Sequence, residues 1–169
     1  IEKMTKSPVA SSVLILLFEE NNSFNFILTL RSKRVETHKG QISLPGGVQE
    51  KNESLKETAL RETKEEIGAL PETIEIIGEL SSIYIPFSGH KVQPYVGWVS
   101  APPKLTPSAN EVERIIIVPV NELIDEENQT QKKTTLRGIP VTMPYFSLKG
   151  EIVWGATSMI LSEFKQIIV

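Results

Sequence analysis

The segment that most constrains the fold of this chain is residues 54–67, which carry a complete set of helix signals. Ser54, followed three residues later by Glu57, forms a capping box in which each side chain accepts a hydrogen bond from the other residue's backbone amide. Gly68 is the kind of residue at which helices commonly end, and Pro71 prevents continuation. The sequence therefore predicts a helix over Ser54–Ile67.

The side chains of this helix divide into a packing face and an acidic arc. At about 100° per residue, one group gathers on the face that we expect to pack on a sheet, and three carboxylates fill an adjoining arc. The packing group is Ala59, Leu60, Thr63 and Ile67, and the acidic group is Glu62, Glu65 and Glu66. Carboxylates at this spacing repel one another, so a hard divalent cation would stabilise them. The alternative is a solvated acidic face that Lys64 helps to balance.

The residues just before the helix indicate what the acidic arc faces. Pro45-Gly46-Gly47 predicts a tight turn whose backbone can approach a ligand or metal closely, because glycine has no side chain. A glycine-rich turn that leads into a carboxylate-lined helix could surround a metal-bound pyrophosphate. Taken alone, these three residues fit an ordinary turn equally well.

The rest of the chain predicts a mixed α/β sandwich of the α+β class, formed by a single domain over residues 1–169. Two apolar segments parted by a short polar run predict a β-hairpin, and no βαβ repeat is visible. The hairpin strands are 11–18 and 24–30, and a short extended piece, Gln41–Leu44, follows the basic loop Arg31–Gly40. Further strands are expected at 74–84, 92–99, 112–118 and 139–146, a short helix at Pro119–Asp125 and a terminal helix at 155–167. We expect the polar stretch Glu126–Lys133 to be a mobile loop.

Charge and composition exclude several classes of protein. A net charge of −3 argues against nucleic-acid binding, which usually needs a basic excess. The chain has no cysteine, so it has neither disulfides nor thiolate metal sites. The longest apolar run, Val13–Phe18, is too short to span a membrane, and no signal-peptide pattern is present. We therefore expect a cytoplasmic enzyme that binds neither nucleic acid nor membrane.

Residues 47–69 resemble the signature of the Nudix hydrolases, the Nudix box. The signature is Gly, five residues, Glu, seven residues, then Arg-Glu-aliphatic-x-Glu-Glu-x-Gly-aliphatic. Its polar and glycine positions are matched by Gly47, Glu53, Arg61, Glu62, Glu65, Glu66 and Gly68. Thr63 and Ala69 replace bulky aliphatic residues at packing positions. Agreement at so many fixed positions makes this resemblance very specific, and it implies a Nudix-type α/β/α sandwich.

The resemblance also implies roles for the box. Glu62 and Glu66 would be the main Mg²⁺ ligands, and Mn²⁺ could substitute for Mg²⁺. Glu65 would be a further ligand or the base that activates water, and the carbonyl of Gly47 or its neighbour would complete the metal shell. Two more residues, Glu53 and Arg61, would form an ionic brace between loop and helix, although a chemical role for them is about equally well supported.

The stretch LTLRSKRVETHKGQISLPGG, residues 28–47, resembles the subfamily of coenzyme A pyrophosphatases. Coenzyme A carries a diphosphate and a 3′-phosphate, so its pocket needs several basic groups, and arginine can bind phosphate oxygens bidentately. The basic residues are Arg31, Lys33, Arg34, His38 and Lys39, and the candidate substrate contacts are Arg31, Arg34, His38 and Gln41. The alternative is that these are solvated loop charges and that His38 is a simple hydrogen-bonding group.

The resemblance implies hydrolysis of the pyrophosphate bond of coenzyme A or an acyl derivative. The products would be 4′-phosphopantetheine, or its acyl form, and adenosine 3′,5′-bisphosphate. The alternative within the family is another substrate, such as ADP-ribose, NADH, a dinucleoside polyphosphate or a nucleoside triphosphate. A different class of protein, a non-catalytic nucleotide-binding Nudix module, should have lost carboxylates of the box. A homodimer is a further open alternative.

Overall fold

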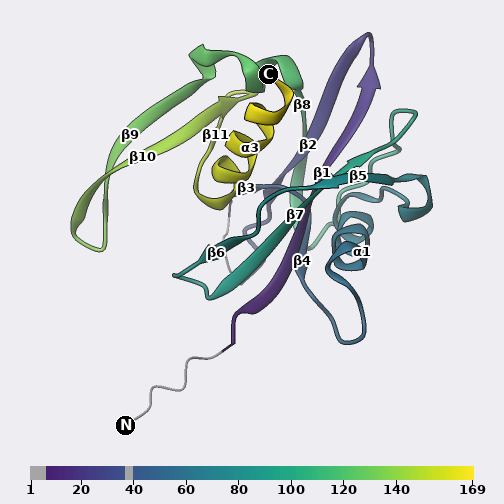
Figure 1. Cartoon of the computed structure of the whole chain (residues 1–169), viewed down its shortest axis with the longest axis horizontal. Coiled ribbons are helices and arrows are strands. Elements are labelled where there is room, and N and C mark those ends of the chain that lie inside the picture. The colour runs from purple at the N-terminus through teal and green to yellow at the C-terminus, as the bar shows by residue number, and fades with distance from the viewer. Residues whose placement is uncertain (1–6, 37–39) are drawn as a thin grey trace.

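A computed structural model of the chain describes residues 7–36 and 40–169 (Figure 1). Its α-helices are α1 (Leu55–Ile67), α2 (Val120–Ile124) and α3 (Gly155–Ile168), and its 3₁₀ helices are η1 (Pro71–Thr73) and η2 (Glu126–Asn128). The strands are β1 (Val9–Glu20), β2 (Ser23–Arg31), β3 (Ile42–Ser43), β4 (Gly46–Val48), β5 (Glu75–Glu79), β6 (Ile83–Ile85), β7 (His90–Trp98), β8 (Val112–Pro119), β9 (Gln129–Leu136), β10 (Ile139–Leu148) and β11 (Glu151–Val153).

The predicted hairpin is confirmed as β1 and β2, which are joined by Asn21 and Asn22. Both asparagines have positive φ angles, 53° and 57°, as a two-residue turn that matches the twist of its strands requires. Asparagine tolerates this conformation better than most residues do. The register pairs Glu20 with Ser23, so the strands extend into the polar run that separates the two apolar segments.

β1 is the central strand of an eight-stranded mixed sheet. One of its edges runs parallel to β7, from Val9 opposite His90 to Leu17 opposite Trp98. The other edge pairs antiparallel with β4 and then with β2. β3 and β8 pair with β2, β5 and β6 pair with β7, and a separate three-stranded sheet has the order β11-β10-β9. The predicted mixed α+β architecture is confirmed.

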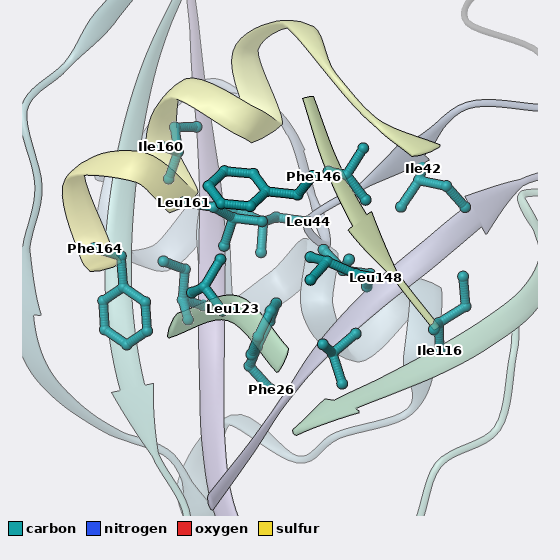
Figure 2. Packing of buried hydrophobic residues seen from close by; sticks show 14 of the residues in the cluster. Phe26, Ile42, Leu44, Ile116, Leu123, Phe146, Leu148, Ile160, Leu161 and Phe164 are labelled. Carbon is teal, nitrogen blue, oxygen red and sulfur yellow. The ribbon is translucent and has the colours of Figure 1, made fainter. Parts of the chain in front are cut away.

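The two faces of the large sheet carry separate apolar clusters, because successive residues of β1 point to opposite sides. Leu14 and Leu16 pack with Ala59 and other residues of α1. The larger cluster lies on the opposite face, where side chains of β10, α2 and α3 meet Phe26 of β2 (Figure 2). The helices α1 and α3 thus lie on opposite sides of β1, as the predicted sandwich requires (Figure 1).

The prediction of a mobile loop over 126–133 is wrong. Residues 126–128 form η2, and the rest of the stretch is the first part of β9, which pairs with β10 from Gln129 opposite Phe146 to Leu136 opposite Ile139. β9 escapes detection because it is exposed on both faces and so lacks the alternation of apolar and polar residues that marks a half-buried strand.

Two further segments differ from the predictions. The strand expected over 74–84 is divided into β5 and β6, which pair with different parts of β7. The turn expected at Pro45-Gly46-Gly47 is limited to a bend at Pro45, because Gly46 and Gly47 begin β4, which pairs with β1. The two short helices predicted near 119–125 and 155–167 are confirmed as α2 and α3. None of the helices in the described part of the chain has the length and apolar character needed to cross a membrane.

Candidate active site

α1 begins and ends as predicted. The Ser54 hydroxyl accepts a hydrogen bond from the Glu57 amide at 3.2 Å, and the Glu57 carboxylate accepts one from the Ser54 amide at 2.6 Å. Gly68 ends the helix with a φ of 78°. The buried face differs from the predicted one, because Leu60 is partly exposed whereas Thr58 is fully buried. The helix is therefore turned slightly, and this places one of its glutamates inside the protein.

That glutamate is Glu66, which is only 4% exposed. Its carboxylate accepts a hydrogen bond from the Gly46 amide at 3.2 Å and lies 3.9 Å from a guanidinium nitrogen of Arg31. Burial raises the pKa of Glu66 to about 8; the contacts with Gly46 and Arg31 oppose this rise, and the nearby Glu62 and Glu111 add to it. A buried carboxylate with so few partners is well suited to bind a cation.

The two glycines of β4 allow the backbone to approach its neighbours closely. A Cβ atom on Gly47 would lie 2.4 Å from the carboxyl carbon of Glu62, and one on Gly46 would lie 2.2 Å from the carbonyl oxygen of Ser12. Real Cβ atoms do not come this close, so no other residue fits either position without a shift. The predicted close approach is therefore present, although the backbone is a strand and its closest neighbour at Gly47 is a carboxylate of α1.

Three carboxylates gather next to these glycines. One oxygen from each of Glu62, Glu66 and Glu111 lies within 4.8 Å of the other two. Burial raises the pKa of Glu62, and the neighbouring charges of Glu65 and Glu111 act in the same direction, against the effect of Arg61. Three clustered carboxylate oxygens, one on a buried residue, fit a hard divalent cation such as Mg²⁺.

Arg61 and Glu53 are joined by two hydrogen bonds. Nε of Arg61 donates to one Glu53 oxygen at 3.0 Å, and a terminal nitrogen donates to the other at 2.8 Å. Glu53 also accepts hydrogen bonds from the Thr58 hydroxyl and the Glu50 amide, each at 2.8 Å. Hydrogen bonds from Arg61 lower the pKa of Glu53 to about 2, against the effect of its burial, and Glu53 in turn raises the pKa of Arg61. This geometry fits the predicted brace between loop and helix.

The sequence profile described as the NUDIX domain matches residues 8–138. The chain belongs to the Nudix family. It is 35% identical over 140 residues to "Nudix hydrolase 3" of Caenorhabditis elegans, an alignment that covers 81% of this chain and 58% of that protein. This Nudix chain thus spans little more than half the length of its worm relative.

Two further comparisons support the Nudix assignment. The chain is 32% identical over 164 residues to "Mitochondrial coenzyme A diphosphatase NUDT8" of Homo sapiens, covering 94% of this chain and 69% of that protein. The structure superposes on a "MutT/nudix family protein" from Enterococcus faecalis with a TM-score of 0.65 and 18% identity, covering 99% of this chain and 65% of that one. The structural match shows the Nudix fold alone.

The acidic residues of the Nudix box divide into two environments. Glu62 and Glu66 belong to the carboxylate cluster, whereas Glu65 lies outside it with a side chain that is 49% exposed. One terminal nitrogen of Arg61 donates to Glu65 at 3.1 Å and to Glu62 at 2.8 Å. Two of the three predicted carboxylates are thus brought together, and Arg61 holds the third beside them.

Glu111 is the residue of the cluster that sequence patterns did not single out. It lies just before β8, 45 positions after Glu66. The pairing of β8 with β2 and a hydrogen bond from the Ser108 amide to the Glu66 carbonyl, at 2.9 Å, bring this segment to the end of α1. The backbone carbonyl of Glu111 accepts a hydrogen bond from the amide of Ser32, next to Arg31. No local pattern could have found Glu111, because its contact with Glu66 joins segments that are distant in the sequence.

The predicted substrate contacts lie at different depths. Arg31, at the end of β2, is beside the carboxylate cluster. Gln41 lies next to Arg31, because its carbonyl accepts a hydrogen bond from the Arg31 amide at 2.9 Å. Arg34 is exposed, and His38 lies outside the described residues. The basic loop of this Nudix chain therefore leaves the sheet directly at the candidate metal site.

Proposed function

We propose that this protein is a divalent-metal-dependent Nudix pyrophosphohydrolase that cleaves coenzyme A or an acyl derivative. The observation that supports this most directly is the cluster of Glu62, Glu66 and Glu111 next to Gly46 and Gly47 of β4, which have no side chains. A non-catalytic binding module has no need of three clustered carboxylates in partly buried surroundings, since their mutual repulsion costs stability.

These three glutamates would hold the cation, together with a backbone carbonyl of β4. Backbone pairs in an antiparallel ladder alternate between bonded and non-bonded. The amide of Leu14 donates to the carbonyl of Pro45, and the amide of Gln49 donates to the carbonyl of Ala10. Ser12 and Gly47, midway between these two pairs, therefore belong to the hydrogen-bonded set, whereas Gly46 lies opposite Val13 in the set without hydrogen bonds. The carbonyl of Gly46, the neighbour of the predicted Gly47, is therefore the better candidate ligand.

A bound Mg²⁺ or Mn²⁺ would supply Lewis-acid activation of water and neutralise charge on the diphosphate. Glu65 is the candidate proton acceptor, because it lies beside the cluster and remains accessible to solvent. Water adds to one phosphorus as the bridging P–O bond breaks, and the other phosphate leaves with the bridging oxygen. Arg31 would bind the diphosphate oxygens, and Glu53 with Arg61 would keep α1 in register with the preceding loop.

Coenzyme A is proposed as substrate on two grounds. One is the likeness to a human coenzyme A diphosphatase over most of both chains. The other is the run of basic residues after Arg31, which can meet the extra phosphate of this substrate. Arg34, His38 and Gln41 are its candidate contacts, and the products would be 4′-phosphopantetheine and adenosine 3′,5′-bisphosphate.

The test is a substrate panel with Mg²⁺: coenzyme A, an acyl derivative, ADP-ribose, NADH, a dinucleoside polyphosphate and a nucleoside triphosphate. We expect the highest kcat/KM for coenzyme A or its acyl form. Glu66→Gln should lower kcat by orders of magnitude while the melting curve shows an intact fold, and Glu113→Gln, at an exposed position of β8, should leave kcat unchanged. If Glu66→Gln keeps more than about a tenth of the rate, a barrier change below about 1.4 kcal/mol, the metal site is wrongly placed.

A further inference from the structure

The two arginines of the candidate active site are fixed to very different degrees. The guanidinium group of Arg61 donates hydrogen bonds to Glu53, Glu62 and Glu65 and to the carbonyl of Val48, all between 2.8 and 3.1 Å. Arg31 approaches Glu66 only to 3.9 Å, which is an ion pair but too long for a hydrogen bond. Its Nε atom is buried without a hydrogen-bond partner among the described residues. The side chain of Arg31 is therefore held by fewer polar contacts than that of Arg61.

The charges around Glu66 explain why Arg31 lies there. Glu66 is buried, and among the described residues the charged groups beside it, other than Arg31, are the carboxylates of Glu62 and Glu111. While no cation occupies the cluster, Arg31 supplies the positive charge that this buried carboxylate needs. A divalent cation in the cluster would replace that charge and, being positive, would repel the guanidinium group.

We propose that Arg31 is an exchangeable counter-ion, which pairs with Glu66 while the cluster lacks a cation and moves to the substrate's diphosphate when the cation binds. This inference rests on the proposed function. A guanidinium group gains more from bidentate contacts with phosphate oxygens than from a single long contact with a carboxylate. Because the Arg31 side chain has no hydrogen bond to another described residue, the exchange needs only a rotation of that side chain.

If Arg31 is such a counter-ion, its contribution to phosphate binding depends on Glu66. Arg31 should add little to phosphate binding in the metal-free protein, because Glu66 holds it, and should add much once Glu66 is neutralised. A permanent phosphate contact would contribute equally in both cases. A double-mutant cycle between the two positions separates these two possibilities, because coupled residues give non-additive effects.

The experiment measures binding of methylenediphosphonate, a diphosphate analogue that is not hydrolysed, by calorimetry in EDTA. We expect Arg31→Gln to change the dissociation constant by less than about twofold when Glu66 is present. In the Glu66→Gln background, the same substitution should weaken binding by about tenfold, the loss of one charge-assisted contact. Additive effects would overturn the proposal.

A second arm uses Ca²⁺, a cation that also prefers oxygen ligands. With Ca²⁺ present, Arg31→Gln should weaken binding of the analogue by about tenfold even with Glu66 intact. Lys33→Gln, which removes an exposed charge from the same loop, should have the same small effect with and without Ca²⁺. If Arg31→Gln does not fold, Arg31→Met keeps the apolar stem and takes its place in both arms.

The outcomes distinguish this inference from the proposed function. A wild-type protein that does not bind the analogue even with Ca²⁺ would overturn both. A protein that binds the analogue with Ca²⁺, but in which Arg31→Gln weakens binding equally with and without the cation, would overturn the exchange alone. In that case Arg31 would be a fixed phosphate contact of a functional site.

Discussion

At the residue scale, the glycines of β4 act through the space that they leave rather than through unusual backbone angles. Neither Gly46 nor Gly47 is among the described residues with positive φ, so a larger residue could adopt both conformations. What excludes it at Gly47 is the carboxylate of Glu62, which occupies the volume of the missing side chain. A single methyl group there would therefore act on the candidate metal site directly.

We expect Gly47→Ala to lower both activity and stability. The new Cβ would displace the Glu62 carboxylate or push β4 away from α1, at a cost of about 1–3 kcal/mol. The melting temperature should fall by about 2–4 °C for each kcal/mol, and affinity for Mn²⁺ measured by calorimetry should fall at least about tenfold. Gly78→Ala is the matched control, because a Cβ there meets nothing within 4 Å. Equal behaviour of the two variants would contradict the steric explanation.

The residues that could be predicted from the sequence are those whose contacts are local. Ser54, Glu57 and Gly68 act within α1, so their spacing along the chain was sufficient. Glu111 meets Glu66 through contacts between segments that are distant in the sequence, and the constraint on Gly46 comes from Ser12 on β1. No local pattern contains these contacts. The resemblance to the Nudix box supplied the importance of Gly47 and Glu62, but not the contact between them.

At the element scale, α1 carries two buried threonines, of which one has hydrogen-bond partners for its hydroxyl group and the other has none among the described residues. Thr58 donates to Glu53 and to the carbonyl of Ser54, whereas the hydroxyl of Thr63 is buried without a partner in the described part of the structure. Thr63 is also one of the two positions where this chain departs from the aliphatic residues of the Nudix box. A lone buried hydroxyl costs about 1–3 kcal/mol.

Thr63→Val should therefore stabilise the protein by about 1 kcal/mol, because it replaces an unsatisfied hydroxyl with a methyl group of similar size. Thr58→Val makes the same chemical change at a buried hydroxyl that is hydrogen-bonded, and should destabilise the protein by about 1 kcal/mol or more. Urea denaturation of both variants measures the difference. A loss of stability in Thr63→Val would mean that its hydroxyl has a partner.

The brace between Glu53 and Arg61 should make the stability of α1 depend on pH. The pKa of Glu53 is lowered from 4.5 to about 2 in the folded protein, so its contribution is fully present above about pH 4.5 and is lost as the pH falls towards 2. Arg61→Ala should lower stability at neutral pH by about 2–4 kcal/mol, because Glu53 is left unpaired and partly buried.

Denaturation curves recorded between pH 2.5 and pH 7, at intervals of about half a pH unit, test this prediction. The wild type should lose up to about 1.4 kcal/mol more per pH unit than Arg61→Ala within the acidic window, the slope for one proton. If Arg61→Ala melts like the wild type and only substrate affinity falls, Arg61 is a ligand-binding residue and the brace is wrong.

At the scale of the whole molecule, strands from distant parts of the chain meet at the candidate site. β2 delivers Arg31, β4 delivers the glycines, α1 delivers two glutamates, and the segment before β8 delivers Glu111. The mixed sandwich was predictable because its apolar hairpin and amphipathic helix have clear periods. The polar strand β9 was not, because it contributes no buried face and forms only by pairing with β10.

This arrangement leads to a prediction about the 3′-phosphate of coenzyme A. Because Arg31 lies beside the metal cluster, it belongs with the diphosphate, and the exposed Arg34 is left for the 3′-phosphate. Dephospho-coenzyme A should have a kcat/KM lower by about tenfold to 150-fold, the worth of one charge-assisted hydrogen bond. Arg34→Ala should remove this difference, whereas Lys33→Ala should preserve it. A higher kcat/KM for ADP-ribose than for coenzyme A would contradict the substrate assignment and leave the Nudix assignment intact.

The two glycines of β4 also limit how the substrate preference of this protein could change. One wall of the site has no side chains, so substitutions cannot reshape it: each replacement at positions 46 and 47 collides with Ser12 or Glu62. In a saturation library selected for a new substrate, these two positions should stay invariant, and the gains should accumulate in the basic segment after Arg31. The reaction would then stay the same while the preferred substrate changes.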